Sequence, residues 1–590
     1  MHTWPPGSTA CSLTSSRSVS TQVSPDFERA HLHTVEYADI GDSTGALQSE
    51  RRRHRPVLEI DGASLTIEDA LEVAAQGRVV RLSAEAARAV RESRDLKLRL
   101  IAAGVPLYGV TTGFGDSADR QINPSTAARL QENLLRFLGC GTGAVAPPEP
   151  TRVAMLLRAN CLAKGNSGVR REVIDYILAL LAEDALPLIP ERGSCGASGD
   201  LIPLSYLGRA LTGEAQIGYR GEVRPAAEVL EELQLEPLRL EAKEGLALTN
   251  GTSFMTAFAC LVVGAARRLA DLADVLTAMT SEAIGGNSGH FNGFLFDAKP
   301  HPGMVASARN VRTLLAGSTL SVETIQEPAD LGGEACVRLA RHVQDRYSIR
   351  CAPHVVGVLR DTLDWVQRWI EIEINSSDDN PLFDTVGGCV HSGGNFYGGH
   401  MGQAMDALKV ALASVCDLID RQLELVVDEK FSAGLPPNLT ALASLGDAEA
   451  GLHHGFKGAQ LCCSAMAAEA LKLSNPATIH SRSTEAHNQD KVSMGTIAAR
   501  DARSITELAD AIAAIHLIAL CQALELRGLR LASPHTRAVH ALVRAHVAFA
   551  DRDRPLDRDI EAVVQLIRTG SVTRVAGLRS EPRAPVVRAA

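Results

Sequence analysis

The sequence has few aromatic residues and no excess of positive charge. Only 4% of its 590 residues are aromatic, and 59 basic against 69 acidic side chains give a formal net charge of −10. Low aromatic content, with Ala and Leu crowded into the second half, favours helices and disfavours an all-β fold. A negatively charged chain has no overall field that would attract phosphate backbones or anionic lipid. We therefore expect neither nucleic acid nor a membrane surface as a partner.

The cysteines lack the spacing of a disulfide framework or a zinc site. Twelve are scattered through apolar surroundings, with no Cys-x-x-Cys pair and no Cys/His ligand spacing. This pattern is typical of small core residues in a reducing compartment, so we predict no metal. The longest apolar stretches, such as Phe254 to Ala266 and Ile512 to Leu524, look too short or too interrupted for the roughly 20 residues that cross a bilayer. No secretory signal is visible, so a soluble, cytoplasmic protein is predicted.

Composition divides the chain into four regions. Residues 1–57 are rich in Ser, Thr, His and Arg and contain a basic cluster at 51–55. They are typical of a mobile extension, and binding of an acidic partner is the alternative. Residues 58–254 alternate helical segments with Gly-, Thr- and Ser-rich loops, residues 255–540 carry apolar residues at helical spacing, and 541–590 are C-terminal helices and tail. We expect a mainly α protein, with a long central helical bundle and a loop-rich N-terminal domain that carries the functional site.

The loop at 193–200 (GSCGASGD) contains three small residues in a row, Ala197, Ser198 and Gly199. Such residues allow the backbone to fold so tightly that the Gly199 nitrogen can approach the Ala197 carbonyl. Attack at this carbonyl, with loss of two waters, one of them involving the Ser198 hydroxyl, would give a methylidene-imidazolone ring, which is an electrophile. An ordinary Gly/Ser turn ahead of a helix is the alternative for the tripeptide on its own.

Nine short segments between about Leu58 and Leu529 add to this signal. They are YGVTTGFG at 108–115, LQENL at 130–134, AKGNSGVR at 163–170, GSCGASGDLIPLSY at 193–206, LALTNGTS at 246–253, QDRYSIRCAP at 344–353, NSSDDNP at 375–381, HSGGNFYG at 391–398 and HNQDKVSMGT at 487–496. In this order they resemble the aromatic amino acid ammonia-lyase and aminomutase family, which includes histidine, phenylalanine and tyrosine ammonia-lyases. The resemblance implies a mostly helical homotetramer whose active sites combine loops of three subunits. It also implies the self-formed 4-methylidene-imidazole-5-one (MIO) ring as the only cofactor.

The resemblance assigns catalytic roles as well. Ala197, Ser198 and Gly199 would form the ring, which captures the substrate amine and makes it a good leaving group. Tyr108 matches the family's proton-abstracting tyrosine, with packing beneath the Gly-rich loop as the alternative. Its reference pKa of about 10 means that it needs electrostatic help to act as a base, which the positive ends of helices could supply. Glu469 matches a carboxylate that faces the amine, and a lone acid on an apolar helix face is expected to be paired or functional.

A second group of residues would bind the substrate carboxylate. Arg350 offers the planar, permanently charged fork that suits bidentate carboxylate binding. Gln344, Tyr347 and Arg350 are spaced by three, so a helix would place all three on one face, with Tyr347 in a catalytic position. The alternative for Arg350 is a structural ion pair with Asp345 or Asp379.

The remaining candidates would surround the substrate ring. By resemblance, Asn250 lies near the carboxylate and the MIO ring, Phe396 lines the site, and Gln489 belongs to its polar support. Phe137 and Leu138 match the pair that contacts the substrate ring, and Phe-Leu resembles phenylalanine-specific members, whereas tyrosine users have His-Leu and histidine users Ser-His. Two apolar side chains would leave a phenol hydroxyl or an imidazole N–H unpaired, at about 1–3 kcal/mol. The alternative is that both are core residues of a helix.

These assignments predict an ammonia-lyase that converts L-phenylalanine to trans-cinnamate. A 2,3-aminomutase would share every residue named and differ in how long the closed Tyr108 loop retains ammonia and the arylacrylate. The segment GFGDS followed by Leu138–Gly143 is similar to bacterial aminomutases, but the lyase is the shorter reaction. An inactive helical scaffold should show damage at Ser198, Tyr108 or Arg350, and all three are intact. Nucleotide-binding, GxSxG and HExxH signatures are absent, which disfavours nucleotide enzymes and hydrolases.

Overall fold

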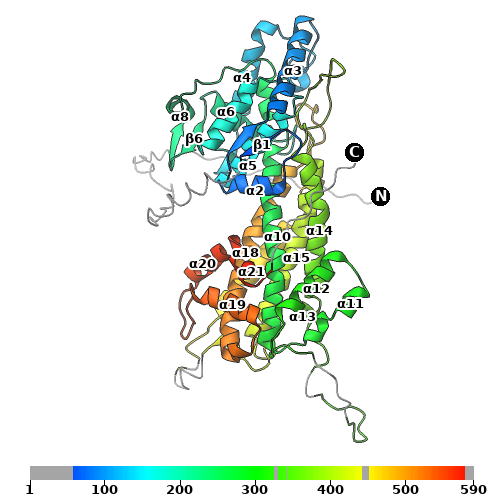
Figure 1. The fold of residues 1–590 in the computed structure, drawn as a ribbon, viewed down its shortest axis with the longest axis vertical. Coiled ribbons are helices and arrows are strands. Elements are labelled where there is room, and N and C mark those ends of the chain that lie inside the picture. Colours follow the sequence, from blue (N-terminus) through cyan, green and yellow to red (C-terminus); the bar gives the residue numbers. More distant parts are fainter. Residues whose placement is uncertain are drawn as a thin grey trace, which may run out of the picture. The chain divides into compact units, whose positions relative to one another are not determined.

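Long helices dominate the computed structural model of the chain (Figure 1). The structure describes residues 57–76, 78–323, 330–339, 342–441, 449 and 451–578, which belong to one unit, Arg55–Ala590. The predicted N-terminal extension therefore lies outside the described residues, apart from Val57.

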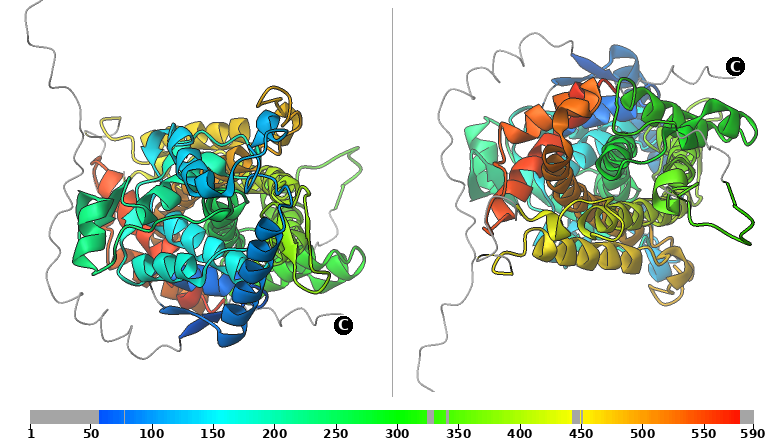
Figure 2. Two further views of the ribbon diagram at one scale, coloured as in Figure 1. Left: turned by 90° about the horizontal axis from the view of Figure 1, so that it is seen from above. Right: turned by 90° about the horizontal axis from the view of Figure 1, so that it is seen from below.

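The predicted helical bundle is confirmed. Its long helices are α10 (Ser253–Ile284), α14 (Ala352–Glu373), α15 (Gly399–Val427), α17 (Lys457–Leu473) and α18 (Gly495–Arg527). Figure 2 views the bundle nearly end-on and shows these helices packed side by side. Apolar residues recur along them at helical spacing, so each helix presents an apolar stripe to its neighbours.

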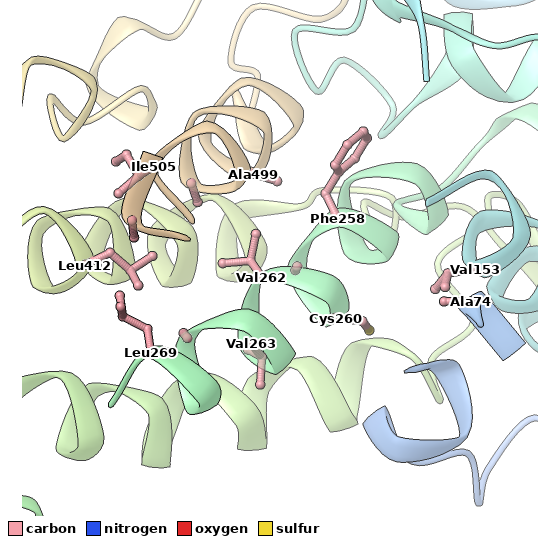
Figure 3. Packing of buried hydrophobic residues seen from close by; sticks show 14 of the residues in the cluster. Ala74, Val153, Phe258, Cys260, Val262, Val263, Leu269, Leu412, Ala499 and Ile505 are labelled. Atoms are coloured by element: carbon pink, nitrogen blue, oxygen red, sulfur yellow. The ribbon is translucent and has the colours of Figure 1, made fainter. Parts of the chain in front are cut away.

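The core of the bundle consists mainly of aliphatic and alanine side chains. In Figure 3, Val262 and Leu269 of α10 lie on the side that faces Leu412 of α15 and Ile505 of α18, whereas Val263 lies on the opposite side of α10. All five are buried. The scarcity of aromatic residues is thus compensated by small side chains that allow the helices to approach closely.

The expectation that the apolar stretches are too short to cross a bilayer is wrong as far as length is concerned. Both α10, with 32 residues, and α18, with 33, are long and apolar enough by length and composition. Their most apolar windows are 78% and 72% buried inside the fold, as in core helices of soluble proteins. Burial within the bundle explains the composition without a membrane.

Shorter elements precede, interrupt and follow the bundle. Near the start of the described chain, β1 (Leu58–Ile60) pairs in parallel with β2 (Val80–Leu82), and Thr66 caps α2 (Ile67–Ala74) in a capping box with Asp69. The other helices are α3 (Ala84–Ala102), α4 (Ala127–Phe137), α5 (Pro148–Ala163), α6 (Arg171–Ala182), α7 (Leu201–Leu211), α8 (Ala226–Glu232), α9 (Glu244–Thr249), α11 (Gly293–Asp297), α12 (Pro302–Leu314), α13 (Tyr347–Arg350), α19 (Pro534–Arg544), α20 (Asp557–Arg568) and α21 (Ser571–Val575).

Three small antiparallel sheets complete the fold. They are β3 (Thr142–Val145) with β5 (Pro190–Arg192), β4 (Leu186–Pro187) with β6 (Gln216–Tyr219) and β7 (Glu222–Pro225), and β8 (Leu382–Asp384) with β9 (Cys389–His391). The predicted regional boundary at 254/255 falls just inside α10, which starts at Ser253, and the boundary at 540/541 falls inside α19. The division into these regions stays a prediction.

The cysteines are only partly core residues. Among the eleven described, all of which are free thiols, five are buried: Cys161, Cys260, Cys416, Cys463 and Cys521. The others are half-buried or exposed, so the expectation of scattered core cysteines is correct for fewer than half of them.

Candidate active site

The Ala197-Ser198-Gly199 loop lies where three helices begin. Helix α7 starts directly after Asp200, and the Asp200 carboxylate accepts hydrogen bonds from the Met255 backbone nitrogen at the start of α10 (2.7 Å) and from the Thr496 hydroxyl at the start of α18. Helix N-termini carry partial positive charge. Three helix N-termini therefore meet at this loop.

Asp200 ties the loop to its surroundings. Its side chain is fully buried, and burial raises the pKa of this carboxyl to about 6, although hydrogen bonds from Thr496, Met255 and Ser194 act in the opposite direction. The Ser194 hydroxyl lies 3.1 Å from the Asp200 carboxylate and 3.2 Å from the Gly199 carbonyl oxygen. These bonds brace both ends of the loop.

The backbone of the tripeptide is held in an unusual conformation. Ser198 has φ of +49° and Gly199 of +79°, in the left-handed region that non-glycine residues rarely adopt. A Cβ atom on Gly199 would lie 2.1 Å from the Gly251 carbonyl oxygen, so only glycine fits. Within the described residues the Gly199 nitrogen donates no hydrogen bond. Because the Gly199 nitrogen has no hydrogen-bond acceptor and lies in a tight turn, its environment fits the attack on the Ala197 carbonyl that the sequence analysis expects.

Two predicted residues contact Ser198 directly. Gln489 donates from Nε2 to the Ser198 hydroxyl oxygen at 2.9 Å, and Asn250 donates from Nδ2 to the Ser198 carbonyl oxygen at 3.4 Å. The Gln489 Oε1 accepts the Thr484 hydroxyl at 3.0 Å, which fixes the amide with its donor toward Ser198. The Oδ1 atom of Asn250 is buried and has no hydrogen-bond partner in the described chain.

The loop that presents Gln489 has a strained backbone. Glu485, Ala486 and His487 are three consecutive non-glycine residues with positive φ, at +48°, +49° and +68°. Such residues persist only where the surrounding contacts enforce them, and they concentrate at functional sites. The sequence analysis identified this loop through the segment at 487–496 and Gln489, but it did not include Glu485 or Ala486.

Tyr108 lies beside this loop, but its pKa is not lowered. The Gly115 nitrogen donates to the Tyr108 hydroxyl at 3.1 Å. Burial raises the pKa of Tyr108, the Gly115 hydrogen bond lowers it, and the negative charge of Glu485 raises it further, so that the net shift is upward. The expected electrostatic activation of this tyrosine is therefore absent from the described part of a single chain.

Phe137 and Leu138 differ in burial. Leu138 is buried in a small cluster with Leu134 and Leu246, against which Tyr108 packs. Phe137, the last residue of α4, is 56% exposed. Phe137 is thus not a core residue of its helix, and the pair lies next to the Tyr108 loop.

Phe396 lies in a loop that reaches the same end of the bundle. It is half-buried, and Gly398 in the same loop packs so closely that a Cβ atom there would lie 2.4 Å from the Met255 sulfur and 3.3 Å from the Thr252 side chain. The loop is anchored to the NSSDDNP segment by a hydrogen bond from Asn395 to the Ser377 carbonyl oxygen at 3.1 Å.

Gln344, Tyr347 and Arg350 lie elsewhere. Helix α13 contains Tyr347 and Arg350 but not Gln344, so the expected three-residue helix face is wrong for Gln344. Asp345 accepts a hydrogen bond from the Asn287 nitrogen, just beyond the C-terminus of α10, whereas Ser198 lies near the N-terminus of α10. The 32 residues of α10 span about 48 Å, at ~1.5 Å per residue. Figure 1 likewise shows α13 and α4 near opposite ends of the bundle.

Arg350 lacks the structural partners considered for it. Asp379 pairs with Lys243, and among the described residues Arg350 forms no ion pair. Its guanidinium lies over the Tyr347 ring at 4.6 Å, its Nε atom is buried without a partner, and Tyr347 is 71% exposed. Both side chains remain free to bind a group from outside this chain.

The role expected for Glu469, a carboxylate that faces the substrate amine, stays a prediction. Glu469 lies exposed on α17, with no contact to the Ser198 loop among the described residues. The carboxylate that lies beside Tyr108 belongs to Glu485, a residue missed in the sequence analysis. Its Oε2 is so close to Gly115 that a Cβ there would lie 2.4 Å away, and partial burial followed by the charge of Asp116 raises the pKa of Glu485. The signal available was its position four residues before Gln489.

The described residues include one group of potential metal ligands, on the β8–β9 hairpin. The ligand atoms of Asp384, Cys389 and His391 lie within 4.8 Å of one another. Antiparallel pairing places Cys389 opposite Asp384, and His391 follows two residues later on the same face, a proximity that spacing in the sequence did not reveal. The Oδ1 atom of Asp384 already accepts backbone hydrogen bonds from Val386 and Gly387. The absence of a metal stays a prediction.

Comparison with known proteins identifies a family model, relatives and solved structures to which this chain is similar. A family model described as "Aromatic amino acid lyase" matches residues 65–545. A histidine ammonia-lyase of Stigmatella aurantiaca is 40% identical over 88% of this chain and 98% of its own length. Among solved structures, tyrosine aminomutase from Streptomyces globisporus matches with a TM-score of 0.83 and 36% identity over 90% of this chain and all of its own. Phenylalanine aminomutase from Pantoea agglomerans matches with a TM-score of 0.81 and 30% identity over 88% of this chain and all of its own.

Proposed function

Since this chain belongs to the aromatic amino acid lyase family and is a carbon–nitrogen lyase or a related aminomutase, we propose that it converts L-phenylalanine to trans-cinnamate and ammonia. The observation that carries the proposal is the Ala197-Ser198-Gly199 turn, with Gln489 bound to the Ser198 hydroxyl and Asn250 to the Ser198 carbonyl oxygen. We propose that this tripeptide forms the MIO ring, which supplies an electrophile for the substrate amine. No other cofactor is proposed.

The residues around the loop have separable tasks in this proposal. Gln489 donates to the hydroxyl oxygen that Ser198 loses as water, which stabilises the leaving group. Tyr108 accepts the β proton of the substrate, and Arg350 of another subunit binds its carboxylate through a two-pronged hydrogen bond. Phe396, Gln344 and Tyr347 line the site when the subunits assemble.

Phenylalanine is proposed as the substrate on the basis of Phe137 and Leu138. The exposed Phe137 ring and the buried Leu138 side chain offer no hydrogen-bond partner to a polar ring. Relatives named for histidine and tyrosine make these two amino acids the competing candidates. Each would leave a polar group unpaired against the Phe-Leu pair, which costs about 1–3 kcal/mol.

Phe137→His is expected to shift the preference toward tyrosine. An imidazole at this position can accept or donate a hydrogen bond to the phenol hydroxyl, so the ratio of kcat/KM for tyrosine over phenylalanine should rise by about tenfold or more, equivalent to about 1.4 kcal/mol. Steady-state kinetics with phenylalanine, tyrosine and histidine measure it. Phe137→Leu, which adds no polar group, is the control. The assignment is wrong if the unaltered enzyme already prefers tyrosine or histidine tenfold.

The lyase is proposed over the aminomutase, and product analysis decides between them. Chromatography of a reaction with L-phenylalanine should show trans-cinnamate and ammonia in equal amounts as main products. The principal alternative, favoured by the structural similarity to two aminomutases, gives β-phenylalanine instead. β-Phenylalanine as the main product would overturn the lyase assignment while leaving the ring proposal intact.

A homotetramer with shared active sites is part of the proposal. Arg350 and Ser198 lie at opposite ends of α10 in one chain, so another copy must complete the site. Only Cys463, Ala467 and Ala470 are buried on α17, which exposes Leu461 and Leu471 to a neighbouring copy. Light scattering should give a mass four times that of the chain, and a fully active monomer would contradict this assembly.

A further inference from the structure

We infer that the buried ion pair of Arg158 and Asp378 is a positioning element that holds the Asn250–Thr252 turn against Ser198 for ring formation. Neither residue touches the tripeptide, and the inference rests on the proposed function. Arg158, on α5, is fully buried, and Asp378, in the NSSDDNP segment, is 4% exposed. A buried charge is retained only where it is paired and hydrogen-bonded, and breaking such a pair is strongly destabilising.

The pair binds the turn from both sides. Arg158 donates from Nη1 to the Asn250 carbonyl oxygen at 2.6 Å and from Nη2 to Asp378 Oδ1. Asp378 Oδ2 accepts both the backbone nitrogen and the hydroxyl of Thr252, each at 2.8 Å. One ion pair thus fixes the residues on either side of Gly251. A lysine at position 158 has one nitrogen in place of the rigid guanidinium fork, so we do not expect it to hold both acceptors in the same geometry.

Gly251 shows how tightly this arrangement fits. Its φ is +144°, and a Cβ atom there would lie 2.6 Å from Arg158 Nη1 and 2.8 Å from Asp378 Oδ1. The Gly251 nitrogen donates to the Ser198 carbonyl oxygen at 3.2 Å, and its carbonyl oxygen accepts the Asp200 nitrogen at 2.7 Å. The position of the ion pair therefore sets the position of the Gly251 N–H and C=O groups, which hydrogen-bond to Ser198 and Asp200.

These contacts suit the chemistry of ring formation. The Gly199 nitrogen bonds to the Ala197 carbonyl carbon, and the first water leaves with that carbonyl oxygen and the hydrogens of the Gly199 and Ser198 nitrogens. Ser198 then loses its Cα proton and its hydroxyl as the second water, with a Cα–Cβ double bond formed. Loss of the Cα proton places negative charge on the Ser198 carbonyl oxygen, which accepts the Gly251 N–H and Asn250 Nδ2 donors. Fixed donors aimed at developing charge stabilise it.

The test compares two neighbouring buried ion pairs. Asp378→Asn removes the charge that binds Arg158 and Thr252, whereas Asp379→Asn breaks the equally buried pair with Lys243, for which no bond to the Asn250–Thr252 turn is found in the described chain. Mass spectrometry of the peptide that spans residue 198, from the folded fraction of each full-length protein, measures the share that is lighter by two waters. We expect this share to fall at least fivefold in Asp378→Asn and to stay near that of the unaltered protein in Asp379→Asn.

The outcomes separate the inference from the proposed function. Full dehydration in Asp378→Asn, or equal loss in both variants, would show a merely structural role and overturn the inference alone. An unaltered protein without the two-water loss would overturn both. If Asp378→Asn yields no folded protein, Arg158→Lys, which keeps the charge, should give a folded protein with the same deficit, and full dehydration there would overturn the inference.

Discussion

Ser198→Ala should lower kcat for ammonia release by at least about 10³-fold, which is the loss expected when the group that forms the covalent bond to the substrate is removed. The substitution deletes the hydroxyl that Gln489 binds and leaves the backbone of the tripeptide in place. Without that hydroxyl no methylidene carbon can form. Steady-state kinetics with phenylalanine measure the loss, and the peptide spanning residue 198 should have the full mass of its unmodified variant sequence.

Ser194→Ala is the matched control for that experiment. Ser194 lies in the same loop and hydrogen-bonds Gly199 and Asp200, but it contributes no atom to the ring. Its removal should cost about tenfold or less in kcat, because the chemistry remains and only the support of the loop is weakened. An unmodified Ala-Ser-Gly tripeptide in fully active protein would disprove the proposed mechanism.

Tyr108→Phe should lower kcat by about 10²- to 10⁴-fold while the two-water loss at Ser198 remains complete. The substitution removes the hydroxyl that Gly115 contacts and keeps the ring that packs against Leu138. Loss of a positioned base has an effect of this size. Because burial raises the pKa of Tyr108 and the phenolate is the active form, the activity of the unaltered enzyme should rise toward alkaline pH.

Tyr176→Phe is the control for the tyrosine experiment. Its hydroxyl donates to the Glu236 carbonyl oxygen, and no contact joins it to the tripeptide loop among the described residues. It should leave kcat within about twofold of the original. Unchanged kcat in Tyr108→Phe would show that Tyr108 is not the base. Its role would then be the alternative, packing beneath the Gly-rich loop.

Local patterns in the amino-acid sequence were enough to predict the helical bundle and the segment proposed to form the ring. Apolar residues at helical spacing over 255–540 predicted the helical bundle, because an amphipathic stripe is a local property of the chain. Ala197-Ser198-Gly199 was identified for the same reason, since the small side chains that a tight turn requires are contiguous.

Contacts between residues far apart in the sequence became known only from the folded chain. The fold placed Gln489 on the Ser198 hydroxyl across 291 positions of sequence, and it placed Glu485, which the sequence analysis missed, beside Tyr108. It also put Arg350 and Ser198 at opposite ends of a helix about 48 Å long. The three-residue spacing of Gln344, Tyr347 and Arg350 did not indicate this separation, because such spacing describes only neighbours on one helix. In the structure α13 is a single turn that does not include Gln344. Long-range packing sets these distances, and the sequence pattern encodes only which residues are neighbours within an element.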